Sequence, residues 1–358
     1  MDNKGLLFIP DISGFTRFVT EMEIEHSRII IQQLLELLID ANELGLEISE
    51  VEGDAILFYK FGKSPDIDTI YRQVEKMFCA FHSHLLSYEL RRFCQCKACI
   101  SAINLSLKVI THYGEFTGYT VKNFSKLIGK DVIVAHQLLK NDIELHEYWL
   151  VTKNVADKPV SNTAAGISWN TSAKQTESGE IPFYYTHLGQ LKQNLSPAPL
   201  SSIEIENKVK AASASREYDA DMRKLFYTSA HFEFRYRWQQ GVKQVEQLDH
   251  LMPAVGMRLK YFTDEGEKII RSSSFIYDPE NTIIFSETDE DKKSALYFTL
   301  EKISAGKSRL TIDYYISKNF SGQFLFKLVK KNKIETSLRQ SLKNLDEFLK
   351  EIILPVEF

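Results

Sequence analysis

The order of apolar patterns along the chain constrains its fold more than any other feature. In the first half, runs typical of strands alternate with stretches of helical period. In the second half, several strand-like segments follow one another over 242–317, and one long amphipathic pattern closes the chain at 322–353. Alternation indicates a sheet covered by helices, and consecutive strands indicate an antiparallel sheet. With 358 residues in all, we predict an α+β protein of two domains joined near the Pro-containing stretch 194–202.

The first half predicts the element order β-α-β-β-α-β-α-β. Its first six elements match a split βαβ arrangement, in which the third strand lies between the first and second and runs antiparallel to both. Residues 157–181 lack periodicity and predict a loop. The expected strands are 5–11, a hairpin within 46–61, 103–113 and 147–152. The first expected helix begins at a Thr20–Glu23 capping box, and the other two cover 66–92 and 124–140.

Two carboxylates stand at corresponding places in this arrangement. Asp11 ends the first strand in FIPDISGFTRF, and Asp54 opens the third in VEGDAILFYKF. Because these strands are expected to be antiparallel neighbours, both side chains should meet at one edge of the sheet. Such oxygen ligands suit Mg²⁺ or Mn²⁺, and the backbone N–H groups of Gly14, Phe15 and Thr16 could face phosphate oxygens. The alternative is that Asp11 caps a turn and Asp54 is an ordinary hairpin residue.

The same two stretches resemble the catalytic domain of class III nucleotidyl cyclases. The resemblance extends to LSLKVITHYGEF, more weakly to LIGKDVIVAHQLL and HLGQLK, and covers about residues 5–195. It implies that Asp11 and Asp54 bind two divalent ions with help from the Ile12 carbonyl. It also implies that the Gly14–Thr16 backbone holds a nucleotide triphosphate. Since the family forms its sites between two such domains, the resemblance further implies a homodimer.

The chain departs from the family pattern at residues that complete the chemistry. Ile133 stands where the family has its transition-state Asn, and Gln137 stands where it has Arg. Gln137 cannot supply the charge, and Ile133 cannot donate the hydrogen bond, that stabilise a phosphoryl transition state. Glu50 occupies the base-selecting position and resembles the guanine-type choice. The resemblance therefore implies a degenerate module that binds metal and nucleotide without efficient cyclisation.

A cluster of cysteines follows in RRFCQCKACIS, where Cys94, Cys96 and Cys99 fall within six residues. Zinc sites require four ligands, usually Cys or His, and the cluster supplies three. Ordinary reduced thiols and a redox role are the two alternatives. The candidates for a fourth ligand are Cys79, His82, His84 and His112.

The second half resembles the START-like superfamily (SRPBCC, polyketide-cyclase-like) over about 200–358. The resemblance depends on Arg237-Trp238-x-x-Gly241-Val242, Pro253-x-x-Gly256, TLEKISAGKSRLTIDYYI and the final SLKNLDEFLKEI. It implies an apolar cavity between a curved sheet and the C-terminal helix that binds a lipid or another hydrophobic small molecule. Plain core packing is the alternative for each candidate lining residue. These candidates are Trp238, Met252, Met257, Phe262, Phe275, Phe285, Tyr297 and Tyr314.

Composition excludes several classes of partner. A net charge of −4 gives no bulk attraction to nucleic acid or anionic lipid. The chain has no run of about 18 apolar residues, so we expect no membrane span. The N-terminal stretch lacks the basic region and cleavage site of a signal peptide. Four cysteines do not make a disulfide framework, so we expect a reducing, cytoplasmic location.

Three functions remain open at this point, and with them the question of whether the chain is an enzyme. The first is a two-domain sensor or signalling protein, with a degenerate cyclase-like module coupled to a domain that binds a hydrophobic small molecule. The second is an active adenylate or guanylate cyclase regulated by the C-terminal domain. The third is an enzyme of the polyketide cyclase or hydrolase type that uses the C-terminal cavity.

Overall fold

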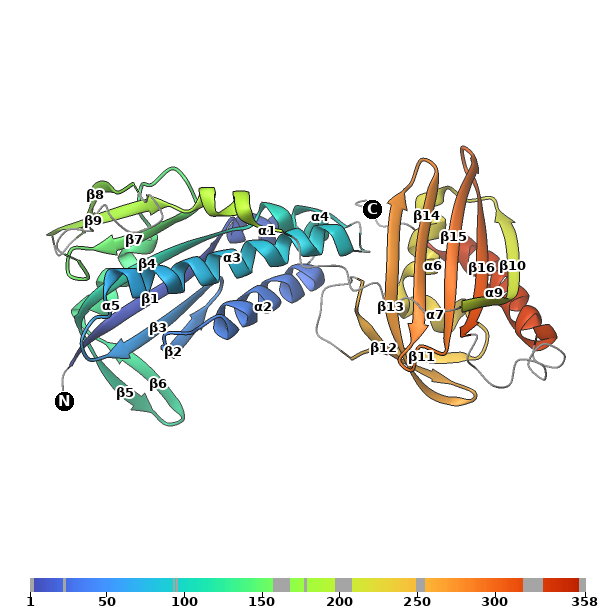
Figure 1. Ribbon diagram of the computed structural model, residues 1–358, viewed down its shortest axis with the longest axis horizontal. Helices are drawn as coiled ribbons and strands as arrows, with labels where there is room; N and C mark the ends of the chain where they lie inside the picture. The colour runs from blue at the N-terminus through green and yellow to red at the C-terminus, as the bar shows by residue number, and fades with distance from the viewer. Residues whose placement is uncertain are drawn as a thin grey trace. The chain divides into compact units, whose positions relative to one another are not determined.

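The computed structural model describes residues 3–21, 24–92, 94, 96–156, 168–176, 179–196, 208–248, 255–317 and 331–353. They form a mixed α+β protein with two compact units: the first comprises residues 1–90 and 98–198, and the second comprises residues 199–358 together with the short segment 91–97. Within the described ranges, no helix combines the length and the apolar composition that crossing a bilayer requires. Each unit is built on its own seven-stranded sheet (Figure 1).

The N-terminal sheet has the strand order β2-β3-β1-β4-β7-β9-β8, and a separate hairpin pairs β5 with β6. The strands are β1 (Lys4–Ser13), β2 (Glu47–Glu52), β3 (Ala55–Phe61), β4 (Ser106–Glu115), β5 (Thr117–Val121), β6 (Phe124–Ile128), β7 (Tyr148–Thr152), β8 (Asn170–Thr176) and β9 (Gly179–His187). The helices are α1 (Phe15–Glu21), α2 (Ile24–Asp40), α3 (Ile67–Arg91), α4 (Lys97–Ser101) and α5 (Lys130–Leu139), with 3₁₀ turns η1 (Ala102–Asn104) and η2 (Gly189–Asn194).

The predicted split βαβ order is confirmed, because β3 lies between β2 and β1 and is antiparallel to both. Three local predictions were wrong. Thr20 lies inside α1, where its hydroxyl donates to the Thr16 carbonyl at 2.7 Å, so it does not cap a helix. The stretch 124–128 is strand β6 rather than helix, and part of the predicted 157–181 loop forms β8 and the start of β9.

Both faces of this sheet are buried, which explains why β1 shows a continuous apolar run. Leu7 and Ile9 pack with Val132 and Leu138 of α5 on one face. Successive side chains of a strand point to opposite faces, so Leu6 and Phe8 enter the other layer, where Phe8 makes an edge contact with Phe58. Long helices α2 and α3 run in front of the sheet in Figure 1 and contribute fully buried residues.

The C-terminal unit contains one antiparallel sheet in the order β10-β16-β15-β14-β13-β12-β11. Its strands are β10 (Lys208–Tyr218), β11 (Val242–Gln247), β12 (Arg258–Thr263), β13 (Gly266–Asp278), β14 (Thr282–Asp289), β15 (Ser294–Ser304) and β16 (Lys307–Ser317). The helices are α6 (Met222–Ala230), η3 (Phe232–Phe234), α7 (Arg235–Trp238) and α9 (Lys331–Glu351).

One long helix packs on this sheet. Leu342, Leu345 and Phe348 of α9 join Leu310 and Ile312 of β16 in the core of the unit. Burying such an apolar stripe contributes about 1.5–3 kcal/mol for each large side chain. The strands β11 to β16 fall within the range 242–317 that the sequence predicted for them. Helix α6 begins at Met222, and the Asp221 carboxylate caps it by accepting from the Lys224 amide.

Candidate functional site

The predicted carboxylate pair comes together in one open cleft of the N-terminal unit. Asp11 on β1 is paired in register with Ala55 on β3, and the Ile12 amide donates to the Asp54 carbonyl at 3.1 Å. Asp11, Ile12 and Asp54 line the same cleft of about 1280 Å³. The antiparallel register of two sheet neighbours is therefore what brings carboxylates 43 residues apart in sequence to the same place.

A lysine that sequence reasoning missed also enters this site. Lys108 on β4 is in register with Asp11, and its Nζ lies 3.3 Å from Asp11 Oδ1. Burial raises the pKa of Asp11 although Lys108 opposes the shift. Burial, together with the nearby Asp11 charge, raises the pKa of Asp54 to about 6. One ammonium group thus faces two carboxylates, which leaves the pair short of positive charge.

Asp54 should make the stability of the metal-free protein depend on pH. Its folded-state pKa of about 6, against an ordinary 3.8, means that the folded state holds the proton more tightly. The resulting stabilisation is present in full below about pH 4 and is lost as pH rises through about 6. We expect Asp54→Asn to raise Tm at pH 8 and to leave it nearly unchanged at pH 4. Thermal unfolding in metal-free buffer measures this, and an unchanged or lower Tm at pH 8 would contradict it.

The predicted phosphate-binding segment forms the tight connection from β1 into α1. Gly14 has φ of +91°, a backbone conformation that side chains disfavour. The Phe18 amide donates to the Gly14 carbonyl at 3.0 Å, so the amides of residues 15–17 precede the first bond of the helix. Gly14, Phe15 and Thr16 all line the cleft. Phe15 also packs against the β2–β3 turn, since a Cβ on Gly53 would lie 3.5 Å from its ring.

Glu50, the predicted base-selecting residue, lines the cleft and already contacts two basic side chains. Lys126 on β6 forms an ion pair with its Oε2, and His136 Nε2 on α5 lies 3.7 Å from its Oε1. The carboxylate is only 14 % exposed. A nucleobase that bound at Glu50 would therefore share it with Lys126 and His136, neither of which sequence reasoning identified.

The two residues that depart from the cyclase pattern also face this cleft. Ile133 and Gln137 lie on α5 and line it together with Lys140. Ile133 is 59 % exposed, so it adds apolar surface to this part of the cleft. Gln137 Oε1 is buried and has no hydrogen-bond partner among the residues that the structure describes. The cleft also includes Arg17 and Asn104, which no periodicity or spacing in the sequence identified.

Some of the residues predicted to line a C-terminal cavity do line one, and others are packed in the core. Trp238 and Tyr314 line a cavity of about 160 Å³ beneath α9, and Tyr314 also lines a cleft of about 590 Å³. Phe285 stacks on Phe298 with ring centroids 4.5 Å apart, and Phe275 stacks on Phe226. Met257 packs with Leu259 and Tyr261 in a small core cluster. The Phe262 ring lies under Lys260, and the Tyr297 ring contacts Lys208. Met252 lies outside the described residues.

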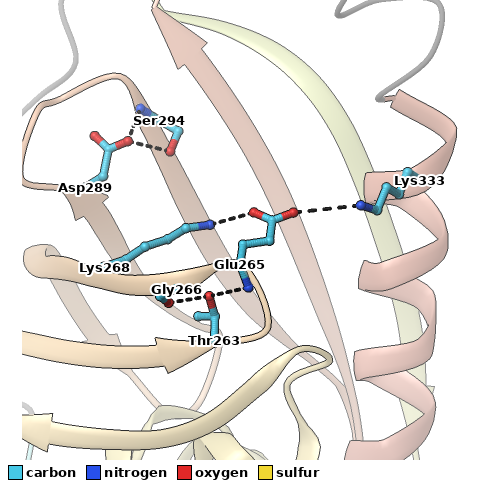
Figure 2. A network of polar contacts seen from close by, with 7 residues as sticks. All are labelled: Thr263, Glu265, Gly266, Lys268, Asp289, Ser294 and Lys333. Atoms are coloured by element: carbon cyan, nitrogen blue, oxygen red, sulfur yellow. Dashed lines mark hydrogen bonds and ion pairs between the residues drawn. The ribbon is translucent and has the colours of Figure 1, made fainter.

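Charged residues stand along the larger C-terminal cleft. Figure 2 shows Glu265, from the turn between β12 and β13, reaching Lys268 Nζ at 3.0 Å and Lys333 Nζ of α9 at 3.8 Å. Beside it, Asp289 accepts hydrogen bonds from the amide and hydroxyl of Ser294. Glu265, Lys268, Asp289, Ser294 and Lys333 all line the cleft. This part of the cleft is therefore polar rather than apolar.

The three clustered cysteines come together, but with a different fourth residue than predicted. One ligand atom from each of His26, Cys94, Cys96 and Cys99 lies within 4.8 Å of the others. Within the part of the chain described, the predicted candidates Cys79, His82, His84 and His112 are not in this group. His112 instead bonds Thr152 and Asp131, at 2.8 Å each. His26 lies 68 residues before Cys94. No rule of ligand spacing in a sequence links two residues at that separation.

One family model and one relative each match about a third of this chain. The family model "Protein of unknown function (DUF2652)" matches residues 31–148. The "Uncharacterized protein Rv2561/Rv2562" of Mycobacterium tuberculosis (strain ATCC 25618 / H37Rv) is 35 % identical over 124 residues, which cover 35 % of this chain. The match spans 58 % of that relative's length.

Solved structures similar to this chain include nucleotide cyclases. The guanylate cyclase domain of RhGC from Catenaria anguillulae, in complex with GTP, is 13 % identical with a TM-score of 0.37, covering 51 % of this chain and 95 % of its own. The adenylyl cyclase CyaB from P. aeruginosa is 16 % identical with a TM-score of 0.36, covering 51 % and 93 %. These TM-scores are low, so the function proposed below depends on the geometry of the cleft.

Proposed function

We propose that the N-terminal unit is a cyclase-like signalling module that binds a nucleoside triphosphate together with Mg²⁺ or Mn²⁺. The observation that supports this most is the convergence of Asp11 and Asp54 from adjacent antiparallel strands on one large cleft. Divalent ions of this type take one or two carboxylates plus substrate phosphates. Asp11, Asp54 and the Ile12 carbonyl would hold the metal.

The charge of the site fits such a metal. Burial raises the pKa values of both carboxyls, and the Asp11 charge raises the pKa of Asp54 further. A bound cation would offset the cost of burying the two charges and would reduce the repulsion between them. A bound metal supplies charge neutralisation for the triphosphate. Of the chain's own groups, Lys108, Arg17 and Lys140 line the same cleft and would attract phosphate oxygens.

We further propose that the module binds nucleotide without efficient cyclisation. The exposed Ile133 and the neutral Gln137 offer no charge at the cleft wall where the family places Asn and Arg. The C-terminal unit would then act as a sensor that binds a small molecule at its α9-side cavities. Its charged cleft around Glu265 and Lys268 favours a ligand with a polar end as well as an apolar body.

The metal and nucleotide assignment is tested with Asp11→Asn and Asp54→Asn. We expect each change to weaken Mn²⁺-dependent binding of a fluorescent GTP or ATP analogue by at least about tenfold, because each removes a charged metal ligand. Fluorescence titration of the full chain measures this. Asp142→Asn, at a side chain that is 90 % exposed, is the matched control and should bind as the wild type does.

Two outcomes would change the proposal. Unchanged Mn²⁺ and nucleotide binding in both variants would remove the metal site. Steady conversion of GTP or ATP to a cyclic product by the wild type would remove the degenerate assignment and favour an active cyclase. A homodimer, which the cyclase-like arrangement requires for a complete site, is checked by sedimentation with and without nucleotide.

A further inference from the structure

Four side chains that can bind a soft metal ion gather where the connection between α3 and α4 meets the start of α2. Their ligand atoms, from His26, Cys94, Cys96 and Cys99, all lie within 4.8 Å of one another. Cys99 Sγ is 3.4 Å from His26 Nδ1. Cys96 and Cys99 are buried, and His26 and Cys94 are half-buried. The group is separate from the carboxylate cleft and has no part in the function proposed above.

We propose that these four residues form a closed Zn²⁺ site. Three thiolates and one imidazole are a common ligand set for tetrahedral structural zinc, with Zn–S about 2.3 Å and Zn–N about 2.0 Å. Ligand atoms of such a site lie about 3.3–3.8 Å apart, so small side-chain movements bring the observed group onto the metal. With four protein ligands no position remains for a substrate, and the site is structural rather than catalytic.

The surroundings of the group favour zinc over the two alternatives from the sequence. None of the four cysteines forms a disulfide, although Cys94, Cys96 and Cys99 are close together. The Cys96 amide donates to Cys94 Sγ at 3.5 Å, and Arg92 donates to the Cys94 carbonyl at 3.3 Å. Amide donors of this kind stabilise and orient a metal-bound thiolate.

The site would fasten the segment after α3 to α2. Cys94 and Cys96 belong to a short connection, whereas His26 lies on a helix that packs on the sheet. Zinc binding would therefore contribute directly to the folding free energy of this region. Because three thiols must lose their protons when Zn²⁺ binds, affinity should fall as pH decreases.

Metal analysis of the full chain tests this proposal. Protein purified without chelators should contain about one zinc per chain, and Cys96→Ser, Cys99→Ser and His26→Gln should each lower zinc affinity at least about tenfold. Cys79→Ser is the matched control, because Cys79 is half-buried on α3 but outside the group; it should retain its zinc.

Cobalt substitution keeps the test independent of whether a variant folds. Reduced wild-type protein titrated with Co²⁺ should develop the intense visible bands of a tetrahedral thiolate site, and Zn²⁺ should abolish them. Zinc well below stoichiometric amounts after reduction and reloading, together with no tetrahedral cobalt spectrum, would overturn the site. So would a loss of zinc from Cys79→Ser as large as that from Cys96→Ser.

Discussion

Arg235→Met is expected to destabilise the C-terminal unit by about 3–5 kcal/mol, the usual cost of breaking a buried ion pair at one partner. Arg235 is 1 % exposed, and its Nη2 lies 2.6 Å from Glu287 Oε1. Its guanidinium also lies over the Phe298 ring, 4.8 Å from the centroid. Without it, the Glu287 carboxylate would remain buried, and the hydrogen-bond partner left to it among the described residues would be the Tyr261 hydroxyl at 3.3 Å. Urea denaturation of the full chain measures the loss.

Two further variants separate a buried unpaired charge from simple loss of packing. The double variant Arg235→Met with Glu287→Leu removes both charges and should recover much of the loss. Arg237→Ala is the matched control on the same helix. Its pair with Glu351 is exposed on both sides, so it should cost less than about 1 kcal/mol. If Arg235→Met costs no more than Arg237→Ala, the pair does not stabilise the unit.

Gly114→Ala is expected to destabilise the N-terminal unit by about 3 kcal/mol or more, because overpacking and lost buried hydrogen bonds add together. A Cβ on Gly114 would lie 2.1 Å from Asp131 Cγ. The Asp131 carboxylate cannot easily move away, since it accepts from the Glu115 amide at 2.7 Å and bonds His112 at 2.8 Å. Thermal and urea unfolding measure the effect.

Gly118→Ala is the matched control for this position. On the exposed strand β5, a Cβ at Gly118 would lie at an ordinary contact distance of 3.9 Å from the Lys126 carbonyl oxygen. It should therefore change stability by less than about 0.5 kcal/mol. Equal stability of the two variants would show that the Asp131 side chain can move away from the added Cβ and keep its hydrogen bonds to His112 and the Glu115 amide.

Local sequence patterns were sufficient where one periodicity dominated. The C-terminal strands β11 to β16 could be placed within a residue or two because each apolar run ends at a turn signal such as Asp278-Pro279 or Gly306. Local patterns failed where contacts with neighbouring elements determine the secondary structure. The stretch 124–128 carries no clear helical face and pairs with β5 as a hairpin, and Thr20 resembles a capping residue but is already inside α1.

For the candidate site, the sequence alone determined that Asp11 and Asp54 meet at one edge of the sheet, because a split βαβ order makes their strands antiparallel neighbours. It also identified three cysteines within six residues. Only the tertiary structure placed Lys108 on Asp11, His136 on Glu50 and His26 beside Cys99. The physical reason is that periodicity and spacing report contacts along one element or between neighbouring strands of a known topology. Contacts between side chains of distant elements depend on packing, which no local pattern records.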